Sequence, residues 1–152
     1  MRIVVPTLGL SLWQPWAGVI ARGWKDIENR SWALPPKYRT ATVAIHAAKR
    51  KTDFEDDLET VARILGQDVQ GLRQDDAVNA FGAVVGVMLF DGYTTKSDSK
   101  WFFGPCGFKI AQAIALPSPV PCRGAQGFFR LPDDVRQEVE KRLVASMAGR
   151  TG

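Results

Sequence analysis

The sequence predicts an α+β domain built on a small, strongly curved β-sheet or barrel of about five to six short strands. The chain has 152 residues, the size of one ordinary domain. Short runs of alternating apolar and polar residues, typical of half-buried strands, recur along it. These runs mostly do not alternate with helix patterns, and this disfavours a doubly wound nucleotide-binding fold.

The N-terminal region begins with a strand, a short helix and a second extended segment. Residues 8–13 alternate as a short half-buried strand does. Pro15 and Gly23 then bracket a short helix over residues 16–22, because proline suits the first helical turn and glycine the position after the last. Residues 25–32 return to an extended pattern.

Two of the predicted strands each have a face with charged, aromatic or titratable side chains. Glu28, Arg30 and Trp32 share a face of the extended segment, because successive side chains of a strand point to opposite sides. A further strand over residues 42–48 places His46 opposite its aliphatic face.

The remaining elements are predicted from helical periodicity, β-branched content and turn residues. An amphipathic helix with an acidic first turn is expected over residues 53–65 and ends at Gly66, and a weaker helix is expected over 68–79. The rest of the chain is expected to form a central strand over 81–90, a polar loop over 91–100, a long strand over 108–116, a proline-rich lead over 117–121, a short strand over 128–131 and a closing helix over 133–147.

The net charge of +4 conceals two strongly charged segments. Residues 22–51 hold eight basic against two acidic side chains, a net charge of +6, whereas residues 53–76 hold eight acidic against two basic ones, a net charge of −6. We expect one cationic face that meets a polyanion while the acidic segment stays away from it, and this favours phosphate-bearing partners over membranes. The alternative is that these charges only solvate unrelated surfaces.

Several classes of protein are disfavoured by the sequence. No segment approaches the roughly 20 apolar residues of a membrane helix, and no signal peptide is indicated. Cys106 and Cys122 form neither a disulfide framework nor a zinc ribbon, so a reducing cytoplasm is the expected location. The P-loop and deaminase motifs are incomplete, and we expect neither a metal nor a cofactor. His46 is the only histidine, so multi-histidine zinc sites are impossible and any serine or cysteine triad, which we do not expect, would have to use His46 itself.

Two motifs remain as candidates for function. Four of the five tryptophans lie between positions 13 and 32, interleaved with basic residues, a combination that stacks bases and neutralises phosphates. The alternative is that these rings belong to the core. Lys25 stands near Glu28 and Arg30, so a lysine beside a carboxylate is available for acid–base work; the alternative is a surface ion pair.

These residues resemble the ASCH domain, a branch of the PUA-like superfamily. The resemblance lies in L-S-L-W-Q-P-W-A over residues 10–17, in G-W-K-D-I-E-N-R-S-W over 23–32, and in later glycine and phenylalanine matches up to Phe128. It covers about residues 8–131 of a single domain spanning 1–152, with 132–148 as a C-terminal helix extension. It implies a PUA-like β-barrel flanked by helices, with a cleft where the signature strand meets the first helix.

The resemblance also implies a nucleic-acid site in that cleft. Lys25, Glu28 and Arg30 are expected to line it. Plausible neighbours are Ser11, Gln14, Trp16, Trp32 and His46. Together with the charge pattern, this predicts a module that binds RNA or another nucleic acid, with backbone contacts from Arg22, Lys37, Arg39, Lys49, Arg50 and Lys51.

A hydrolase is the alternative function that the resemblance suggests. One branch of the family hydrolyses the acetyl amide of N4-acetylcytidine and carries K-x-x-T-x-R where this chain has Lys25, Glu28 and Arg30, so the nucleophilic threonine is replaced by Glu28. Glu28 would then activate water, Lys25 would stabilise the oxyanion and Arg30 would hold Glu28. A ribonuclease that uses His46 with Lys25 is a further possibility, and a protein-interaction domain with an exposed tryptophan patch is a third. The oligomeric state is left open.

Overall fold

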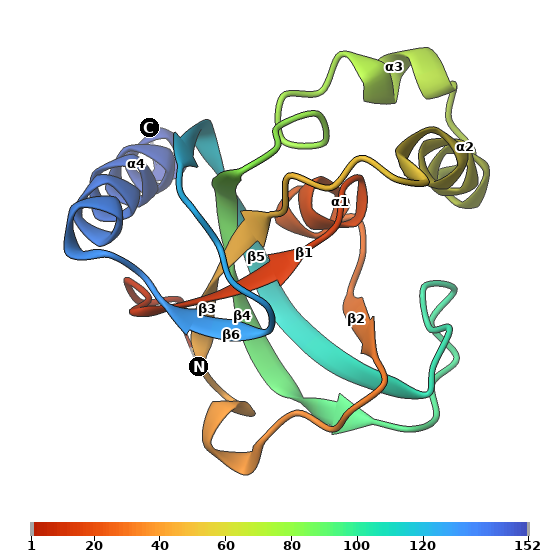
Figure 1. The fold of residues 1–152 in the computed structure, drawn as a ribbon, viewed down its shortest axis with the longest axis horizontal. Helices are drawn as coiled ribbons and strands as arrows, with labels where there is room; N and C mark the ends of the chain where they lie inside the picture. The colour runs from red at the N-terminus through yellow and green to blue at the C-terminus, as the bar shows by residue number, and fades with distance from the viewer. Residues whose placement is uncertain (1, 152) are drawn as a thin grey trace.

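One curved sheet with four α-helices and a single 3-10 turn makes up the computed structural model, which describes residues 2–151 and the side chains of 2–148 (Figure 1). The strands are β1 Leu8–Leu12, β2 Ile27–Arg30, β3 Thr42–Ala47, β4 Ala83–Thr94, β5 Cys106–Pro121 and β6 Phe128–Arg130. The helices are α1 Trp16–Ala21, α2 Phe54–Leu65, α3 Val69–Arg73 and α4 Asp133–Thr151, and the 3-10 turn η1 is Pro36–Tyr38.

The sheet is a mixed half-barrel with the strand order β2-β5-β4-β3-β1-β6. β1 and β3 are parallel, and the other neighbouring strands are antiparallel. Edge strands β2 and β6 are short, and β6 pairs only with Leu8 to Leu10 of β1. The predicted α+β class with a small curved sheet is therefore confirmed, and one side of the barrel remains without strand pairing.

The first elements form where the sequence predicts them. β1 buries Leu10 and Leu12 in the core, as its alternation requires. α1 begins directly after Pro15 and ends at Ala21, with Arg22 as its C-cap. Gly23 then adopts a φ of +78°, a conformation that glycine adopts without a Cβ penalty. The turn after α1 directs the chain into β2.

Three apolar clusters make up the core. The first fills the concave side of the sheet with residues such as Leu10, Phe90 and Phe108. The second lies between the sheet and α4, where Val135, Val139 and Leu143 at four-residue spacing are buried. The third joins α1, α2 and α3 around Trp101, and Leu58, Val61 and Leu72 are buried in it. The predicted apolar stripes of α2 and α4 are thus the surfaces that dock these helices.

Two expectations for the middle of the chain are wrong. The helix expected over 68–79 ends at Arg73, because Asp75 accepts hydrogen bonds from the backbone of Ala77 and Val78 and so stabilises a turn instead. The loop expected over 91–100 begins late, because Tyr93 and its neighbour continue β4 by pairing with β5.

The proline-rich segment 117–121 is also part of a strand and not a lead into one. β5 runs on to Pro121, which pairs with Ala83, and an irregularity in the β4–β5 register separates this end from the rest of the strand. Proline is tolerated there because β2, the other neighbour of β5, pairs only near Phe108, which leaves this stretch of the strand edge without a ladder.

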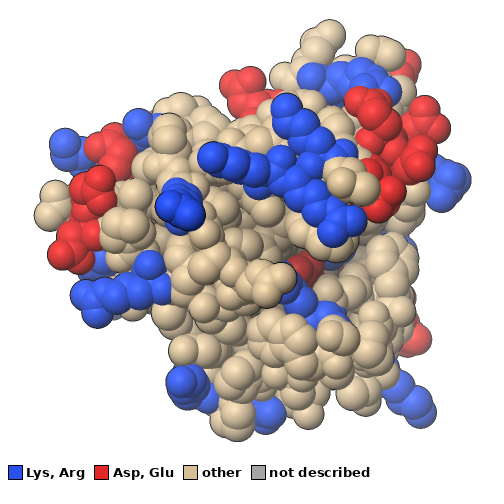
Figure 2. All heavy atoms as spheres, in the orientation of Figure 1, with Lys and Arg blue, Asp and Glu red and all other residues tan. Residues whose placement is uncertain are grey.

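The charged segments do not form separate faces. Figure 2 shows Lys and Arg side chains gathered over the connection between β3 and α2, with acidic side chains of α2 directly beside them. Arg22 pairs with Asp75 at 3.0 Å, and Arg50 lies 3.8 Å from Asp53. The expected single cationic face is therefore wrong, because tertiary pairing brings the two segments together. Among residues 2–151, no helix is long and apolar enough to span a membrane.

Candidate functional site

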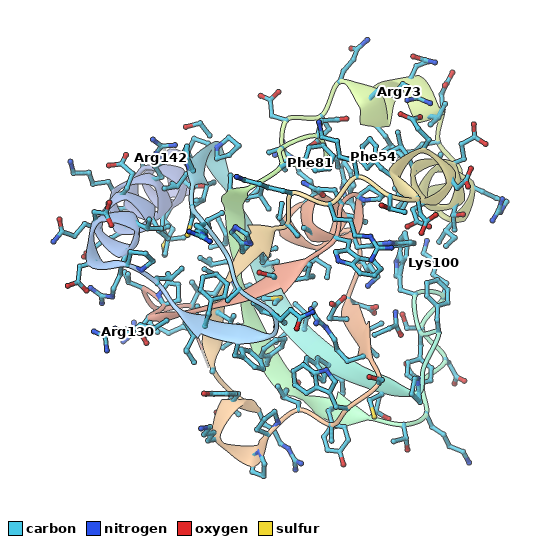
Figure 3. The ribbon with its side chains drawn as sticks, in the orientation of Figure 1. Phe54, Arg73, Phe81, Lys100, Arg130 and Arg142 are labelled. Carbon is cyan, nitrogen blue, oxygen red and sulfur yellow. The ribbon has the colours of Figure 1, made fainter. Side chains whose placement is uncertain are left out.

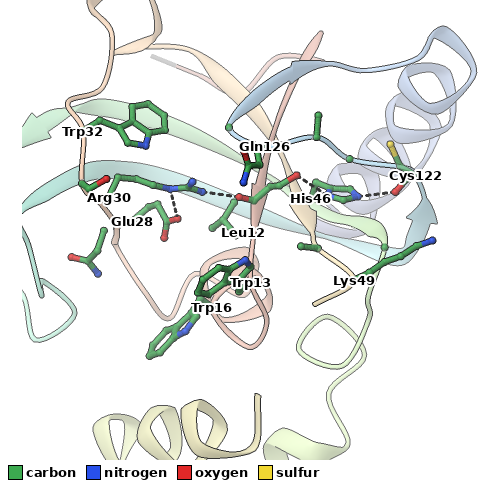
Figure 4. Close-up of a pocket in the computed structure, with 18 of the residues that line it drawn as sticks. Leu12, Trp13, Trp16, Glu28, Arg30, Trp32, His46, Lys49, Cys122 and Gln126 are labelled. Carbon is green, nitrogen blue, oxygen red and sulfur yellow. Dashed lines mark hydrogen bonds and ion pairs between the residues drawn. The ribbon is translucent and has the colours of Figure 1, made fainter. Parts of the chain in front are cut away.

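A cleft of about 1150 Å³ opens on the side of the half-barrel that lacks strand pairing (Figure 4). Its walls come from the end of β1, from β2, from the end of β3 and from the loop over residues 122–127. Phe103, from the loop before β5, adds an exposed ring. The cleft lies where β2 approaches β1 without a backbone ladder, because β2 pairs with β5 on its other side.

Arg30 closes this opening with its side chain. Beyond Leu10, β1 has no β6 partner, and the carbonyl of Ser11 accepts a hydrogen bond from Arg30 Nη2 at 2.7 Å. The backbone amide of Ser11 reaches Gly127 O at 3.5 Å. A guanidinium therefore supplies a donor that a neighbouring strand supplies elsewhere in the sheet.

Lys25, Glu28 and Arg30 lie in one row, with the carboxylate of Glu28 between the two cations. Glu28 Oε2 accepts from Arg30 Nε at 3.0 Å, and Glu28 Oε1 lies 3.6 Å from Lys25 Nζ. Lys25 is 2% exposed and also donates to Ile27 O at 2.5 Å. Burial lowers the pKa of Lys25, although the Glu28 carboxylate opposes this shift. The row is therefore a partly desolvated ion network and not an ordinary surface pair.

Three tryptophans line the cleft. Trp13 is 49% exposed and Trp32 is 37% exposed, whereas Trp16 is half-buried and donates from Nε1 to Asp57 Oδ2 at 3.2 Å. The Trp32 ring packs edge-on against Phe108 at 5.2 Å between centroids, which anchors one side of the ring. Trp13 and Trp32 thus present accessible aromatic surface, as base stacking requires.

Ser11 and His46 face each other across the parallel pair β1–β3, where their Cα atoms are register partners. Ser11 Oγ lies 3.0 Å from His46 Nδ1, and His46 Nε2 lies 2.7 Å from Cys122 O. Because a carbonyl only accepts, Nε2 carries the proton, and Nδ1 of the neutral ring accepts from the Ser11 hydroxyl. Burial lowers the pKa of His46, with the Cys122 hydrogen bond opposing the shift, and so favours this neutral form.

Several residues expected at the site lie elsewhere. Gln14 is 1% exposed, and its amide donates to Ala77 O and Ala80 O while accepting from Gly18 N, so it connects β1 and α1 to the segment before β4. Arg22 pairs with Asp75 away from the cleft.

The basic residues that follow β2 and β3 divide between two places. Lys37 and Arg39 belong to η1 and its cap, at the lower edge of Figure 1, and line no part of the cleft. Lys49 lines the cleft, whereas Arg50 lies over the Trp13 ring at 3.6 Å and Lys51 lies over a phenylalanine ring beside the cleft.

The sequence reasoning missed part of the cleft wall. Asn29 donates to Trp101 O and accepts from Phe103 N at 2.8 Å, so it holds the Phe103 loop against the cleft. Arg123 and its neighbours up to Gly127 form the opposite wall. Gly124 and Gly127 in that loop are the signal that the sequence offered for it. The structure shows why glycine stands at 124, since a β-carbon there would lie 2.7 Å from Ser11 Oγ.

Solved structures share the arrangement of this half-barrel and its helices. The structure is similar to a crystal structure of ASCH from Zymomonas mobilis, with a TM-score of 0.50 and 15% sequence identity over 91% of this chain and 93% of that chain. A serine-to-alanine mutant of ZmASCH from the same organism gives a TM-score of 0.50 and 14% identity over 88% and 94% of the two chains.

The sequence matches no family model and no curated protein. The likeness to the Zymomonas mobilis structures shows that this chain has the ASCH fold, as its motifs indicated.

Proposed function

We propose that this protein binds single-stranded nucleic acid, RNA in the first place, and that its cleft receives an unpaired base. The observation that carries the proposal is the combination of accessible tryptophan rings with a guanidinium and an ammonium group around one cleft of about 1150 Å³. Duplexes keep their bases stacked inside, so a cleft of this kind suits loops, ends and single strands.

The cleft offers each type of contact that an unpaired base requires. Trp32 and Trp13 provide rings for stacking, which contributes about 1 to 3 kcal/mol per base. Arg30 lies between these rings as a donor for a base edge, and its ion pair with Glu28 holds its side chain in place. The base therefore meets a preorganised polar floor.

The phosphate contacts come from fewer residues than the sequence suggested. Lys49 and Arg123 both line the cleft, and both side chains are exposed. Lys37 is exposed at the far end of the sheet, so its charge contributes little at this distance in physiological salt.

The geometry does not favour amide hydrolysis by Glu28. Both of its carboxylate oxygens face cations, Arg30 at 3.0 Å and Lys25 at 3.6 Å. A carboxylate engaged in this way is a poor base for water, because its lone pairs are already committed.

Fluorescence anisotropy with a labelled RNA of about 12 nucleotides tests the proposal. We expect the affinity to fall steeply with salt, and Lys49→Glu to weaken binding by about threefold to tenfold for all sequences alike. Lys37→Glu is the matched control, because it makes the same charge change away from the cleft and leaves the affinity within error.

Two outcomes contradict the proposal. One is the absence of binding to RNA and to a DNA strand of the same sequence. The other is an equal loss in the Lys49→Glu and Lys37→Glu variants, since it would mean that net charge and not the cleft determines binding.

A further inference from the structure

Ser11 and His46 form a polar pair that base binding does not use. They lie on neighbouring parallel strands, and both line the cleft. Figure 4 shows the His46 ring directed at the Cys122 carbonyl. Ser11 is half-buried, whereas His46 is 3% exposed. Ser11 is thus the more exposed member of the pair, and both residues line the cleft.

The pair has the three parts of an activated serine. The nucleophile and base are 3.0 Å apart, within hydrogen-bond reach, and the base is oriented by a third group, the carbonyl of Cys122 at 2.7 Å. The carbonyl holds the proton on Nε2 and leaves the Nδ1 lone pair directed at Ser11 Oγ. The neutral form of His46 that burial favours is the form that accepts a proton.

The loop after Cys122 packs against the hydroxyl of Ser11 and the ring of His46. A β-carbon on Gly124 would lie 2.7 Å from Ser11 Oγ and 2.5 Å from His46 Nδ1, so the backbone of Gly124 packs directly on the pair. Within the described part of the chain, the amides of residues 123–126 donate to no other backbone group. Amides without a backbone acceptor are available as donors to an oxyanion formed at Ser11, and we expect this loop to provide them.

We infer that Ser11 is an acyl-accepting nucleophile and that the protein hydrolyses carboxylic esters at this pair. Arg123 and Lys49 at the cleft favour esters whose alcohol carries a negative charge. This activity goes beyond the proposed binding of nucleic acid and depends on different residues.

The reaction balances without a cofactor. His46 Nδ1 takes the hydroxyl proton while Ser11 Oγ attacks the ester carbon, and the carbonyl electron pair moves onto oxygen. The intermediate collapses, the bond to the alcohol breaks, and His46 returns the proton to the leaving oxygen. Water then attacks the acyl-serine, His46 takes a proton from it, and Ser11 leaves with that proton, so that ester and water become acid and alcohol.

Labelling with a fluorophosphonate, followed by peptide mass spectrometry, tests the inference on the full chain. We expect one label, on Ser11, and hydrolysis of p-nitrophenyl acetate that falls to the uncatalysed rate in Ser11→Ala. Ser31 lines the same cleft without a histidine beside it, so Ser31→Ala is the matched control and retains both labelling and hydrolysis.

Two further variants separate chemistry from folding. Gly124→Ala keeps Ser11 and His46 but places a methyl group against them, and we expect labelling to fall at least tenfold while circular dichroism shows a folded chain. His46→Gln is expected to lower labelling to a similar extent and to abolish its dependence on pH, which in the wild type rises as His46 loses its proton below pH 6.5.

The inference is overturned if no label reaches Ser11 under conditions that label a known serine esterase, or if Ser11→Ala hydrolyses the ester at the wild-type rate. Labelling that is unchanged in His46→Gln would also overturn it. These assays contain no nucleic acid. A negative result therefore rejects the esterase inference without affecting the proposed RNA binding, and a protein that binds no RNA could still be an esterase.

Discussion

At the cleft and on the α4 side of the sheet, strand carbonyls without a ladder partner accept hydrogen bonds from an arginine, but only the first arginine lies at an open cleft. In each place an arginine held by a glutamate donates to strand carbonyls that lack a ladder partner. Arg30, paired with Glu28, donates to Ser11 O at the cleft. Arg142, paired with Glu138, donates to Ser118 O and to Pro119 O at 2.6 Å on the α4 side (Figure 3).

The surroundings of the two arginines decide what each does. Arg142 belongs to α4, whose apolar residues pack on the sheet, so its side chain bonds to a strand edge that a helix already covers. Arg30 spans an opening with no apolar cover, and the Glu28 side chain beneath it is 10% exposed, against 39% for Glu138. A guanidinium that bridges an uncovered opening leaves polar groups facing a cleft, and such groups are available to a ligand.

The largest expected difference in stability between the two sides follows from replacing the glutamate that holds each arginine. Glu28→Gln leaves the ammonium of Lys25 buried without a counter-charge, and we expect a loss of about 3 to 5 kcal/mol in the free energy of unfolding. Glu138→Gln is the matched change on the exposed pair and should cost less than about 1 kcal/mol. Urea unfolding measures both.

Adding Lys25→Met to Glu28→Gln removes the unpaired charge, and most of the lost stability should return. Equal losses in the two glutamine variants would mean that the cleft pair is no more desolvated than the pair on α4.

A smaller difference is expected from removing the arginines. Arg30→Met removes hydrogen bonds to Glu28 and to Ser11 O, and it should cost about 1.5 to 3 kcal/mol because one partner is a buried carboxylate. Arg142→Met should cost less than about 1 kcal/mol, because water reaches Glu138. Thermal unfolding of both variants beside the wild type compares them, and the reverse order would contradict the role assigned to burial.

The smallest expected effect is a dependence of stability on pH that comes from His46, which lies on the cleft side. The pKa of His46 is lowered in the folded state, so the unfolded chain binds this proton more readily. Stability from neutral His46 is therefore complete above pH 6.5 and is lost as the pH falls towards the folded pKa, by at most about 1.4 kcal/mol per pH unit.

Proton NMR of the single histidine follows its titration directly, and urea unfolding between pH 6.5 and 5.5 follows its effect on stability. His46→Gln should show a flatter dependence over this interval. A folded pKa at or above 6.5 in the NMR titration would contradict the prediction.

Local patterns in the sequence determined most of the elements and their buried faces. Alternation in β1 and β3, Pro15 and Gly23 around α1, and the apolar spacing in α4 each depend on neighbours in the chain, which a single sequence displays. The contact between Glu28 and Arg30 was predictable for the same reason, because strand geometry places alternate side chains on one face, whereas Lys25 lies before the strand and meets Glu28 only in the folded structure.

Only the tertiary structure decided which of these groups meet across the fold. Ser11 and His46 are 35 positions apart and become neighbours through the parallel register of β1 and β3, and Cys122 joins them from 76 positions beyond His46. Gln14 looked like a site residue and is instead buried in the fold, while the acidic segment neutralises part of the basic one. Contacts of this range depend on sheet order and strand register, and the local sequence pattern contains neither.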